Sequence, residues 1–187
     1  MFKKLFSFLL VIAFFMGICL VSNSQSISLG VPLYSQYSEG NQQNWCWAAC
    51  AKMIGKYKYS AGTRNMVDIV RYVKGSVVDD GGTNQEAITA IKYASYDRAI
   101  YVQGISNFSR AFITNSLSNQ WPIYVRIAMN TGHAVVLRGF DTSTDKVTLN
   151  NPTSSSRYYY PTYTQLVNGT WEDVRPYQSN LYSVTLM

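Results

Sequence analysis

The chain has 187 residues, a formal net charge of +6 and charged side chains at only 14% of its positions. Its basic residues are spread along the sequence rather than clustered, which is not the pattern of a nucleic-acid-binding surface, so we exclude a nucleic acid as a partner. The length that follows residue 24 is enough for one compact domain with its own core. We therefore predict a single domain over residues 25–187.

The pattern of residues 1–24 is typical of a secretory signal peptide. A pair of lysines precedes an apolar run at positions 5–20, and small residues occupy the expected cleavage positions. Because this run is short for a membrane-spanning helix, we predict that the segment is removed. The mature protein is then secreted or periplasmic, without a membrane partner. A lipoprotein anchored through Cys19 is disfavoured, because Ile18 stands where such signals need a small residue.

The next part of the chain has the patterns of helices. One segment begins after Asn44, which is placed to cap it, and has no helix breaker before Gly55. Another has apolar residues on one helical face and Gly75 after its end. A third begins with Thr83 and Glu86 at the spacing of a capping box. Together with a fourth, weaker pattern, these features predict helices within residues 46–57, 63–75, 82–94 and 109–119.

After Asn119 the pattern changes to short segments rich in β-branched and aromatic residues, separated by turn residues, which predicts the strands of a sheet. We interpret the tyrosines at 158–160 and Tyr163 as strand and core residues rather than as a ligand-binding platform. Helices followed by antiparallel strands predict an α+β fold. The predicted strands lie within residues 121–129, 133–140, 146–151, 157–163 and 180–186.

Two cysteines, Cys46 and Cys50, follow the signal peptide, four residues apart on one predicted helix. A single helical turn is a poor geometry for a disulfide, and two cysteines with one histidine lack the fourth ligand of a zinc site, so we expect neither. Cys50 is flanked by alanines and is predicted to be a small buried hydrophobic residue. Cys46 lies in the first helical turn, where free backbone N–H groups and the helix dipole favour a thiolate.

A nucleophilic thiol needs a base, and His133 is the one histidine of the chain. Its imidazole can take the proton of the Cys46 thiol and return it to the leaving group. The second ring nitrogen needs an orienting acceptor. Asn151 ends the next strand, and a hairpin through the turn at 141–145 would bring it beside the histidine. Asn150 should point to the opposite face of its strand.

The order and spacing of these motifs resemble those of papain-like cysteine peptidases. The similarity is greatest to compact bacterial branches, namely the bacteriocin-processing, double-glycine-leader peptidases and the plant-pathogen effector proteases with a Cys-Trp-Ala-Ala motif. It extends from residue 31 to the C-terminus. The motifs that carry it are VPLYSQ (31–36), WCWAA (45–49), GHAVVLRGF (132–140) and Asn151-Pro152.

This resemblance implies a papain-like α+β fold, with the nucleophile in an N-terminal helical half and the histidine and asparagine in a C-terminal antiparallel β half. It implies Cys46 as nucleophile, His133 as general base and acid, and Asn151 as the residue that orients the imidazole. The oxyanion hole of such enzymes combines the backbone N–H of the nucleophile with an upstream glutamine side chain. We assign this glutamine to Gln36, with Gln42 and Gln43 as alternatives.

The same resemblance implies a monomer that uses no metal or other cofactor and hydrolyses a peptide or protein substrate. An inhibitor or an immunity protein is a further expected partner. Two other functions fit the same motifs. One is acyl transfer with the same triad, as in transglutaminase-like enzymes and cell-wall amidases, and the other is that of an inactive binding or immunity protein on a papain-like scaffold.

Overall fold

A computed structural model describes most of the chain after the predicted signal peptide, and residues 1–24 lie outside the described part. The described residues are 25–40, 42–62, 64–98, 101–104, 108–127, 132–153, 158–168 and 182–185. The helices are α2 (Cys46–Lys58), α3 (Met66–Lys74), α4 (Asn84–Ala94), α5 (Arg110–Ser118) and α6 (Tyr163–Asn168). The strands are β1 (Ser26–Ser28), β2 (Tyr101–Gly104), β3 (Ile123–Ile127), β4 (His133–Asp141), β5 (Lys146–Asn150), β6 (Tyr158–Tyr159) and β7 (Tyr182–Thr185).

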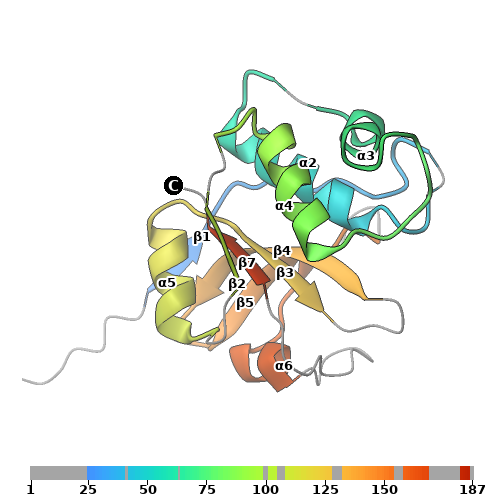
Figure 1. Ribbon diagram of the computed structural model, residues 1–187. Helices are drawn as coiled ribbons and strands as arrows, with labels where there is room; N and C mark the ends of the chain where they lie inside the picture. Colours follow the sequence, from blue (N-terminus) through green and yellow to red (C-terminus); the bar gives the residue numbers. More distant parts are fainter. Residues whose placement is uncertain are drawn as a thin grey trace, which may run out of the picture.

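The helices α2, α3 and α4 gather on one side of the sheet, whereas α5 and α6 lie apart from this group (Figure 1). The long strand β4 organises a five-stranded sheet, because it pairs antiparallel with β1, β3 and β5, and β5 in turn pairs with β6. A second sheet consists of β2 and β7. Helices and antiparallel strands thus form the two halves that the sequence predicts, and the α+β class is confirmed.

Helix α2 begins at Cys46, as predicted, but its cap is not Asn44. The N-cap residue is Trp45, which makes no capping side-chain hydrogen bond, and the Asn44 side chain donates to the carbonyl of Asp79 instead (3.2 Å). The helix also continues past Gly55, which the sequence suggests as a breaker. A Cβ atom at that glycine would lie 2.4 Å from the carbonyl oxygen of Ala94, so the missing side chain allows α4 to pack closely against α2.

The predicted end of α3 at Gly75 and the predicted capping box of α4 are confirmed, and Asn65, which was not predicted, caps the start of α3. The side chain of Asn65 accepts a hydrogen bond from the third residue of α3, and Gly75 ends that helix in the left-handed conformation, with φ of 77°. Thr83 and Glu86 form both hydrogen bonds of a capping box at the start of α4. The two predicted signals need only neighbouring residues, which is why the sequence alone reveals them.

The tyrosine-rich segment differs from the prediction. Only Tyr158 and Tyr159 form a strand, and the chain turns into α6 at Tyr163. Tyr158 and Tyr160 are 42% and 57% exposed, so their interpretation as core residues is wrong. The guanidinium of Arg138 lies 4.7 Å from the ring centre of Tyr158, which gives that ring a cation–π contact at the surface.

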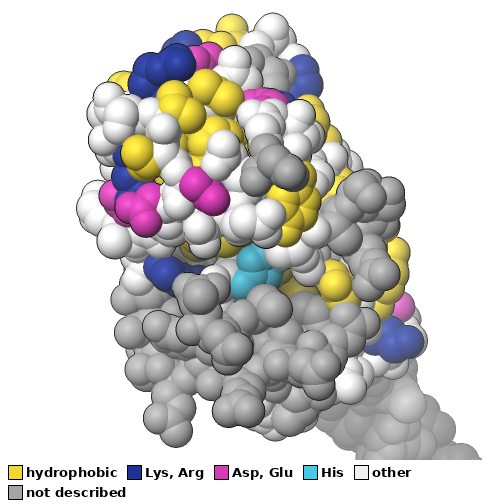
Figure 2. Space-filling model, turned by 90° about the vertical axis from the view of Figure 1, so that its right-hand side faces the viewer, with side chains coloured by type: hydrophobic (Ala, Val, Ile, Leu, Met, Phe, Trp, Pro, Cys, Tyr) yellow, Lys and Arg dark blue, Asp and Glu magenta, His cyan; other side chains and the backbone are white. Residues whose placement is uncertain are grey.

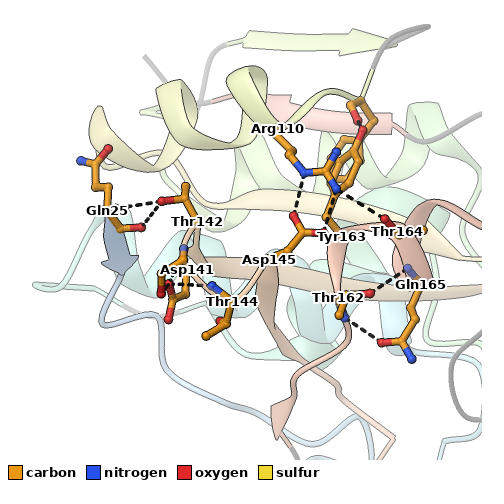
Figure 3. A network of polar contacts seen from close by, with 12 residues as sticks. Gln25, Arg110, Asp141, Thr142, Thr144, Asp145, Thr162, Tyr163, Thr164 and Gln165 are labelled. Atoms are coloured by element: carbon orange, nitrogen blue, oxygen red, sulfur yellow. Dashed lines mark hydrogen bonds and ion pairs between the residues drawn. The ribbon is translucent and has the colours of Figure 1, made fainter. Parts of the chain in front are cut away.

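The turn between β4 and β5 is held by side chains from two other elements (Figure 3). Arg110 of α5 donates two hydrogen bonds, of 2.6 and 2.7 Å, to the carboxylate of Asp145. The same guanidinium lies 4.0 Å from the ring centre of Tyr163. A bidentate ion pair fixes geometry as well as charge. The turn sets the register of β4 and β5 as far as Gly139, which stands opposite Thr148. A register shift between Leu137 and Gly139 then places Val136 opposite Asn150.

The core lies where α2 packs onto β4 of the sheet and α4 packs against α2. Cys50 is completely buried there, as predicted, and its thiol and that of Cys46 are both free. The other fully buried side chains include Met53 and Ile54 of α2, which belong to the same cluster as Val135 of β4. Within the part of the chain that the structure describes, no helix combines the length and the apolar character needed to cross a membrane.

Candidate active site

A cavity of about 160 Å³ lies where the helical half meets the sheet. It brings together Cys46 of α2, His133 of β4 and Gln36 of the preceding loop. Figure 2 shows the histidine in a hollow below the helices. The lining residues are Gln36, Tyr37, Gln43, Asn44, Cys46, Trp47, Gly81, Gly82, Tyr124, Arg126, Gly132, His133, Ala134 and Thr153.

The two tryptophans beside Cys46 attach a loop to the start of α2. Both indole rings are buried, and their N–H groups donate to main-chain carbonyls, from Trp45 to Val78 (2.8 Å) and from Trp47 to Asp80 (3.0 Å). A buried indole requires such a partner, and here the partner is the loop that forms one wall of the cavity. The thiol of Cys46 is therefore half-buried rather than freely exposed.

The same loop reaches the cavity through Asp79 and Gly82. The carboxylate of Asp79 accepts the backbone N–H groups of Gln43 and Asn44, at 3.1 and 2.9 Å, just before α2. A Cβ atom at Gly82 would lie 2.5 Å from the indole ring of Trp47, so only glycine fits at this contact. This loop was not predicted from the sequence, because its role depends on contacts with residues more than thirty positions away.

His133 and Asn151 are joined by a hydrogen bond of 2.8 Å between Nε2 and Oδ1. The backbone N–H and the hydroxyl of Thr153 also donate to this Oδ1, at 3.0 and 2.8 Å. An amide oxygen only accepts, so Nε2 of the imidazole carries the proton and Nδ1 is left as the basic nitrogen. The contact from Thr153 was not predicted, although an asparagine that bonds the backbone two residues later is a common turn pattern.

Asn150, the preceding residue, faces away from the histidine. Its completely buried side chain donates to the carbonyls of Val31 and Pro32, at 3.1 and 3.2 Å, and accepts a bond of 2.9 Å from Arg138. The two neighbouring asparagines thus have separate surroundings: Asn151 contacts the imidazole, and Asn150 ties β5 to the segment that follows β1.

Gln36 is only 1% exposed and is fixed at both its backbone and its side chain. Its backbone N–H donates to the carbonyl of Pro152 (2.9 Å), next to Asn151. Its side-chain Nε2 donates to the carbonyl of Gln43 (2.6 Å) and makes a longer contact of 3.5 Å with the carbonyl of Gln42. Gln43 also lines the cavity through exposed atoms, whereas Gln42 is not among the lining residues.

Glu39 anchors the loop that carries Gln36. Its carboxylate pairs with Lys52 of α2 and accepts the backbone N–H of Met66 at the start of α3. The Lys52 ammonium also lies 4.3 Å from the ring centre of Tyr34. A carboxylate at a helix N-terminus is stabilised by the helix dipole, so this loop is held by both helices at once.

The pKa values of the two reactive groups move apart. Burial raises the pKa of the Cys46 thiol, and the backbone N–H groups of Ala134 and Trp47 and the charge of Arg126 offset this only in part. Burial lowers the pKa of His133, against a smaller opposite effect of the bond to Asn151. The helix start therefore does not by itself lower the pKa of this thiol, and burial favours the neutral form of both groups.

We predict a broad, bell-shaped pH dependence of kcat/KM. Activity requires that the thiol and imidazole together hold one proton. At low pH a second proton binds to His133 and stops the reaction, and the lowered pKa of this imidazole places the acidic limb below pH 6.5. At high pH the shared proton is lost from Cys46, and the raised pKa of this thiol places the basic limb above pH 9.0. Steady-state rates between pH 4 and 10.5, roughly the range in which these side chains titrate, test this. An acidic limb centred above pH 6.5 would contradict it.

Among the described residues, no three side chains of His, Cys, Asp or Glu lie together so that they could hold a metal ion. Cys46, Gln36 and His133 meet at one cavity, with Asn151 directly behind the imidazole. The arrangement places a thiol, a base with a defined basic nitrogen and an amide donor around one small space. These are the groups that nucleophilic attack on a carbonyl carbon requires.

The sequence matches the model of a family described as papain-like cysteine protease AvrRpt2, over residues 25–166. In three dimensions the chain is similar to a C39-like peptidase from Bacillus anthracis, with a TM-score of 0.58, 13% identity, and coverage of 86% of this chain and 98% of that chain. It is also similar to the peptidase domain of Streptococcus ComA, a bifunctional ABC transporter involved in a quorum-sensing pathway, with a TM-score of 0.58, 11% identity, and coverage of 84% and 99%. No curated protein matches the chain significantly.

Proposed function

Because the chain belongs to the family of papain-like cysteine proteases whose model it matches, we propose that Cys46, His133 and Asn151 form the catalytic triad of this cysteine peptidase. The observation that carries the proposal is the hydrogen bond from His133 Nε2 to Asn151 Oδ1, at a cavity that the thiol of Cys46 also lines. It leaves the imidazole Nδ1 free to act as the base.

The reaction begins when a peptide carbonyl enters the cavity beside Cys46. His133 Nδ1 takes the thiol proton as the sulfur attacks the carbonyl carbon, which gives a tetrahedral intermediate with a negative oxygen. The backbone N–H of Cys46 and the side-chain amide of Gln36 stabilise this oxygen. One amide hydrogen of Gln36 is held by the carbonyl of Gln43, and the other has only a long contact, so it remains available to the oxyanion.

The reaction is then completed in two steps, formation of a thioester and its hydrolysis. The imidazolium of His133 donates its proton to the leaving amine, and the C–N bond breaks to leave a thioester on Cys46. A water molecule, deprotonated by the same Nδ1, attacks the thioester, and the thiol regains its proton as the carboxylic acid product departs. Asn151 keeps the ring in the same orientation throughout, because its Oδ1 accepts a hydrogen bond from the Nε2 N–H in every state.

The proposed triad is tested by labelling and by cleavage of a peptide library. An epoxide or iodoacetamide probe should label Cys46 near neutral pH in the native protein and much more slowly in His133→Ala. The library should then be cut by the native protein and left intact by the labelled one. Transfer of acyl groups to added amines in place of hydrolysis would instead favour the transglutaminase-like reaction, and labelling that is unchanged in His133→Ala would overturn the triad.

We predict that substitution of Asn151 lowers turnover less than substitution of His133. Asn151→Ala should lower kcat about tenfold to a hundredfold, because the ring persists but samples wrong orientations, whereas His133→Ala should lower it about a thousandfold or more. Asn151→Asp should retain substantial activity. Its carboxylate accepts the same hydrogen bond but stabilises the imidazolium, so the acidic limb of the pH profile should move to higher pH.

Asn150→Ala is the matched control for this series. Asn150 does not contact the imidazole, but its loss leaves buried carbonyls without a donor and should lower the free energy of unfolding by about 1–3 kcal/mol with kcat near that of the native protein. Chemical denaturation and steady-state rates measured on both variants separate the two roles. Equal losses of kcat at both positions would contradict the orienting role of Asn151.

We infer that the enzyme is exported and acts as a monomer on a peptide or protein outside the cytoplasm, with residues 1–24 as its signal peptide. Strand β1 starts at Ser26 and pairs with β4, and the backbone N–H of Gln25 donates to Thr142 (2.8 Å). Cleavage after residue 24 would therefore leave the edge of the sheet complete. N-terminal sequencing of the protein recovered from the culture medium or periplasm should begin at or near Gln25, and an uncleaved N-terminus would contradict this.

A further inference from the structure

Arg126 is the charged side chain of the catalytic cavity that the mechanism does not use. It stands on β3 directly opposite Ala134, the residue after His133. A Cβ atom at Gly132 would lie 3.3 Å from its Nη2 atom, so the guanidinium lies close to this glycine. Its positive charge reaches the thiol of Cys46, where it lowers the pKa. Arg126 and His133 both line the same cavity.

The guanidinium of Arg126 is incompletely paired. It carries five N–H donors, and Asn84 at the start of α4 is the one described side chain that accepts a hydrogen bond from it (Nη1 to Oδ1, 3.1 Å). Arg110 and Arg71, by contrast, each form an ion pair with an aspartate. None of the residues that line the cavity is an aspartate or a glutamate. The cavity therefore presents a partly buried positive charge without a carboxylate among the described residues.

A half-buried arginine with free N–H donors is complementary to a carboxylate, which it can bind with two parallel hydrogen bonds. The substrate is the group that enters this cavity. Because Arg126 and Cys46 line the same space of about 160 Å³, and an extended peptide advances about 3.3 Å per residue, the complementary side chain must lie close to the bond that is cut.

We propose that Arg126 is a specificity-determining residue that selects peptides with an aspartate or glutamate within two residues of the scissile bond. This proposal rests on the peptidase function of the cavity proposed above. The arginine acts on the substrate and not on the thiol alone, so its contribution depends on whether the peptide carries the carboxylate. An arginine that only stabilised the thiolate would act equally on every substrate.

The first test compares pairs of peptides that differ only by glutamate or glutamine at each of the two positions on either side of the cleaved bond. At one of these positions, the native protein should prefer glutamate by about tenfold to a hundredfold in kcat/KM, the range of a charge-assisted hydrogen bond. Arg126→Gln should abolish the preference by slowing the glutamate peptide much more than the glutamine peptide, which loses only the effect of the charge on the thiol. Arg126→Lys should keep part of it, and Arg126→Glu should reverse it in favour of lysine.

Asn84→Ala is the matched control. This change removes the hydrogen bond that Arg126 makes across the cavity but keeps the charge, so the preference for glutamate should persist. Thermal unfolding of all variants identifies any that are destabilised, and the comparison within each peptide pair is insensitive to the fraction of active enzyme. The preference should also weaken as salt is raised, since part of it is electrostatic.

A second test does not require peptide cleavage. Iodoacetate and iodoacetamide both alkylate a thiolate with loss of iodide and differ in that the first carries a carboxylate. The measured quantity is the rate of alkylation of Cys46 by iodoacetate divided by the rate with iodoacetamide. Arg126→Gln should lower this ratio by about tenfold, whereas Asn84→Ala should leave it near that of the native protein. If the native protein cleaved no peptide but Arg126→Gln still lowered this ratio, the proposed peptidase function would be wrong and the carboxylate site would stand.

The specificity proposal fails if the native protein cleaves peptides but shows no preference for glutamate at any of the four positions. It also fails if Arg126→Gln slows both peptides of each pair equally and shifts the pH profile. That result would mean that the arginine acts by stabilising the thiolate and not by binding the substrate. A ratio of alkylation rates that is unchanged in Arg126→Gln would overturn the carboxylate site directly.

Discussion

Cys46→Ala is expected to lower kcat by at least about ten-thousandfold and to leave the fold intact. The variant removes the sulfur that forms the thioester, and no neighbouring side chain can replace a nucleophile. Its structural cost is small, because the thiol is half-buried at the first residue of α2 and makes no disulfide, so the free energy of unfolding should change by about 1 kcal/mol. Peptide cleavage and denaturant unfolding measure the two effects.

Cys50→Ala is the control that separates chemistry from packing. Cys50 is one helical turn further along and completely buried, so its truncation should lower stability somewhat and keep most of the activity. If Cys46→Ala retained native turnover, the nucleophile assignment would be wrong. If Cys50→Ala alone abolished turnover in a folded protein, the nucleophile would have to be sought one turn deeper.

Gln36→Ala is expected to lower kcat about a hundredfold to a thousandfold with little change in KM. In the proposed mechanism this amide donates to the oxyanion of the tetrahedral intermediate and not to the ground-state carbonyl, so its loss should affect the transition state more than substrate binding. The effect should appear with every peptide substrate. Steady-state kinetics on a single good substrate, with thermal unfolding to check the fold, is sufficient to measure it.

Gln42→Ala and Gln43→Ala are the matched controls. Both residues hold the Gln36 side chain through backbone carbonyls, which alanine retains, so both variants should stay within a few fold of the native kcat. A native-like Gln36→Ala together with an inactive Gln43→Ala would move the oxyanion donor to Gln43, which also lines the cavity. The thiol–imidazole mechanism would survive that result.

The parts of the fold that the sequence predicts correctly depend on neighbouring residues. The end of α3 and the cap of α4 are examples, since Gly75 and Thr83 each act within one helical turn. The cap of α2 was predicted wrongly because Asn44 has a stronger tertiary partner in the loop at Asp79. Strand β1 was not predicted, because a three-residue strand without an apolar pattern exists only by pairing with β4.

The candidate site follows the same rule. His133 and Asn151 could be paired from the sequence, because a tight hairpin connects their strands, but the register shift between Leu137 and Gly139 could not be predicted. Gln36 could be proposed only from the resemblance, since nothing in the adjacent residues indicates that the loop folds back to Pro152. Arg126 had no distinguishing signal, because its proposed role depends on the lack of a carboxylate among the described residues that line the cavity.

The backbone hydrogen bond from Gln36 to Pro152 gives the enzyme an internal reporter of its own motion. This bond joins the loop before α2 to the segment after β5, and both line the cavity, through Gln36 and Thr153. Its N–H can exchange with deuterated solvent only when this bond is broken, by local or by global opening. The exchange rate of this single amide therefore measures how often the two segments separate, and a peptide bound in the cavity should slow it.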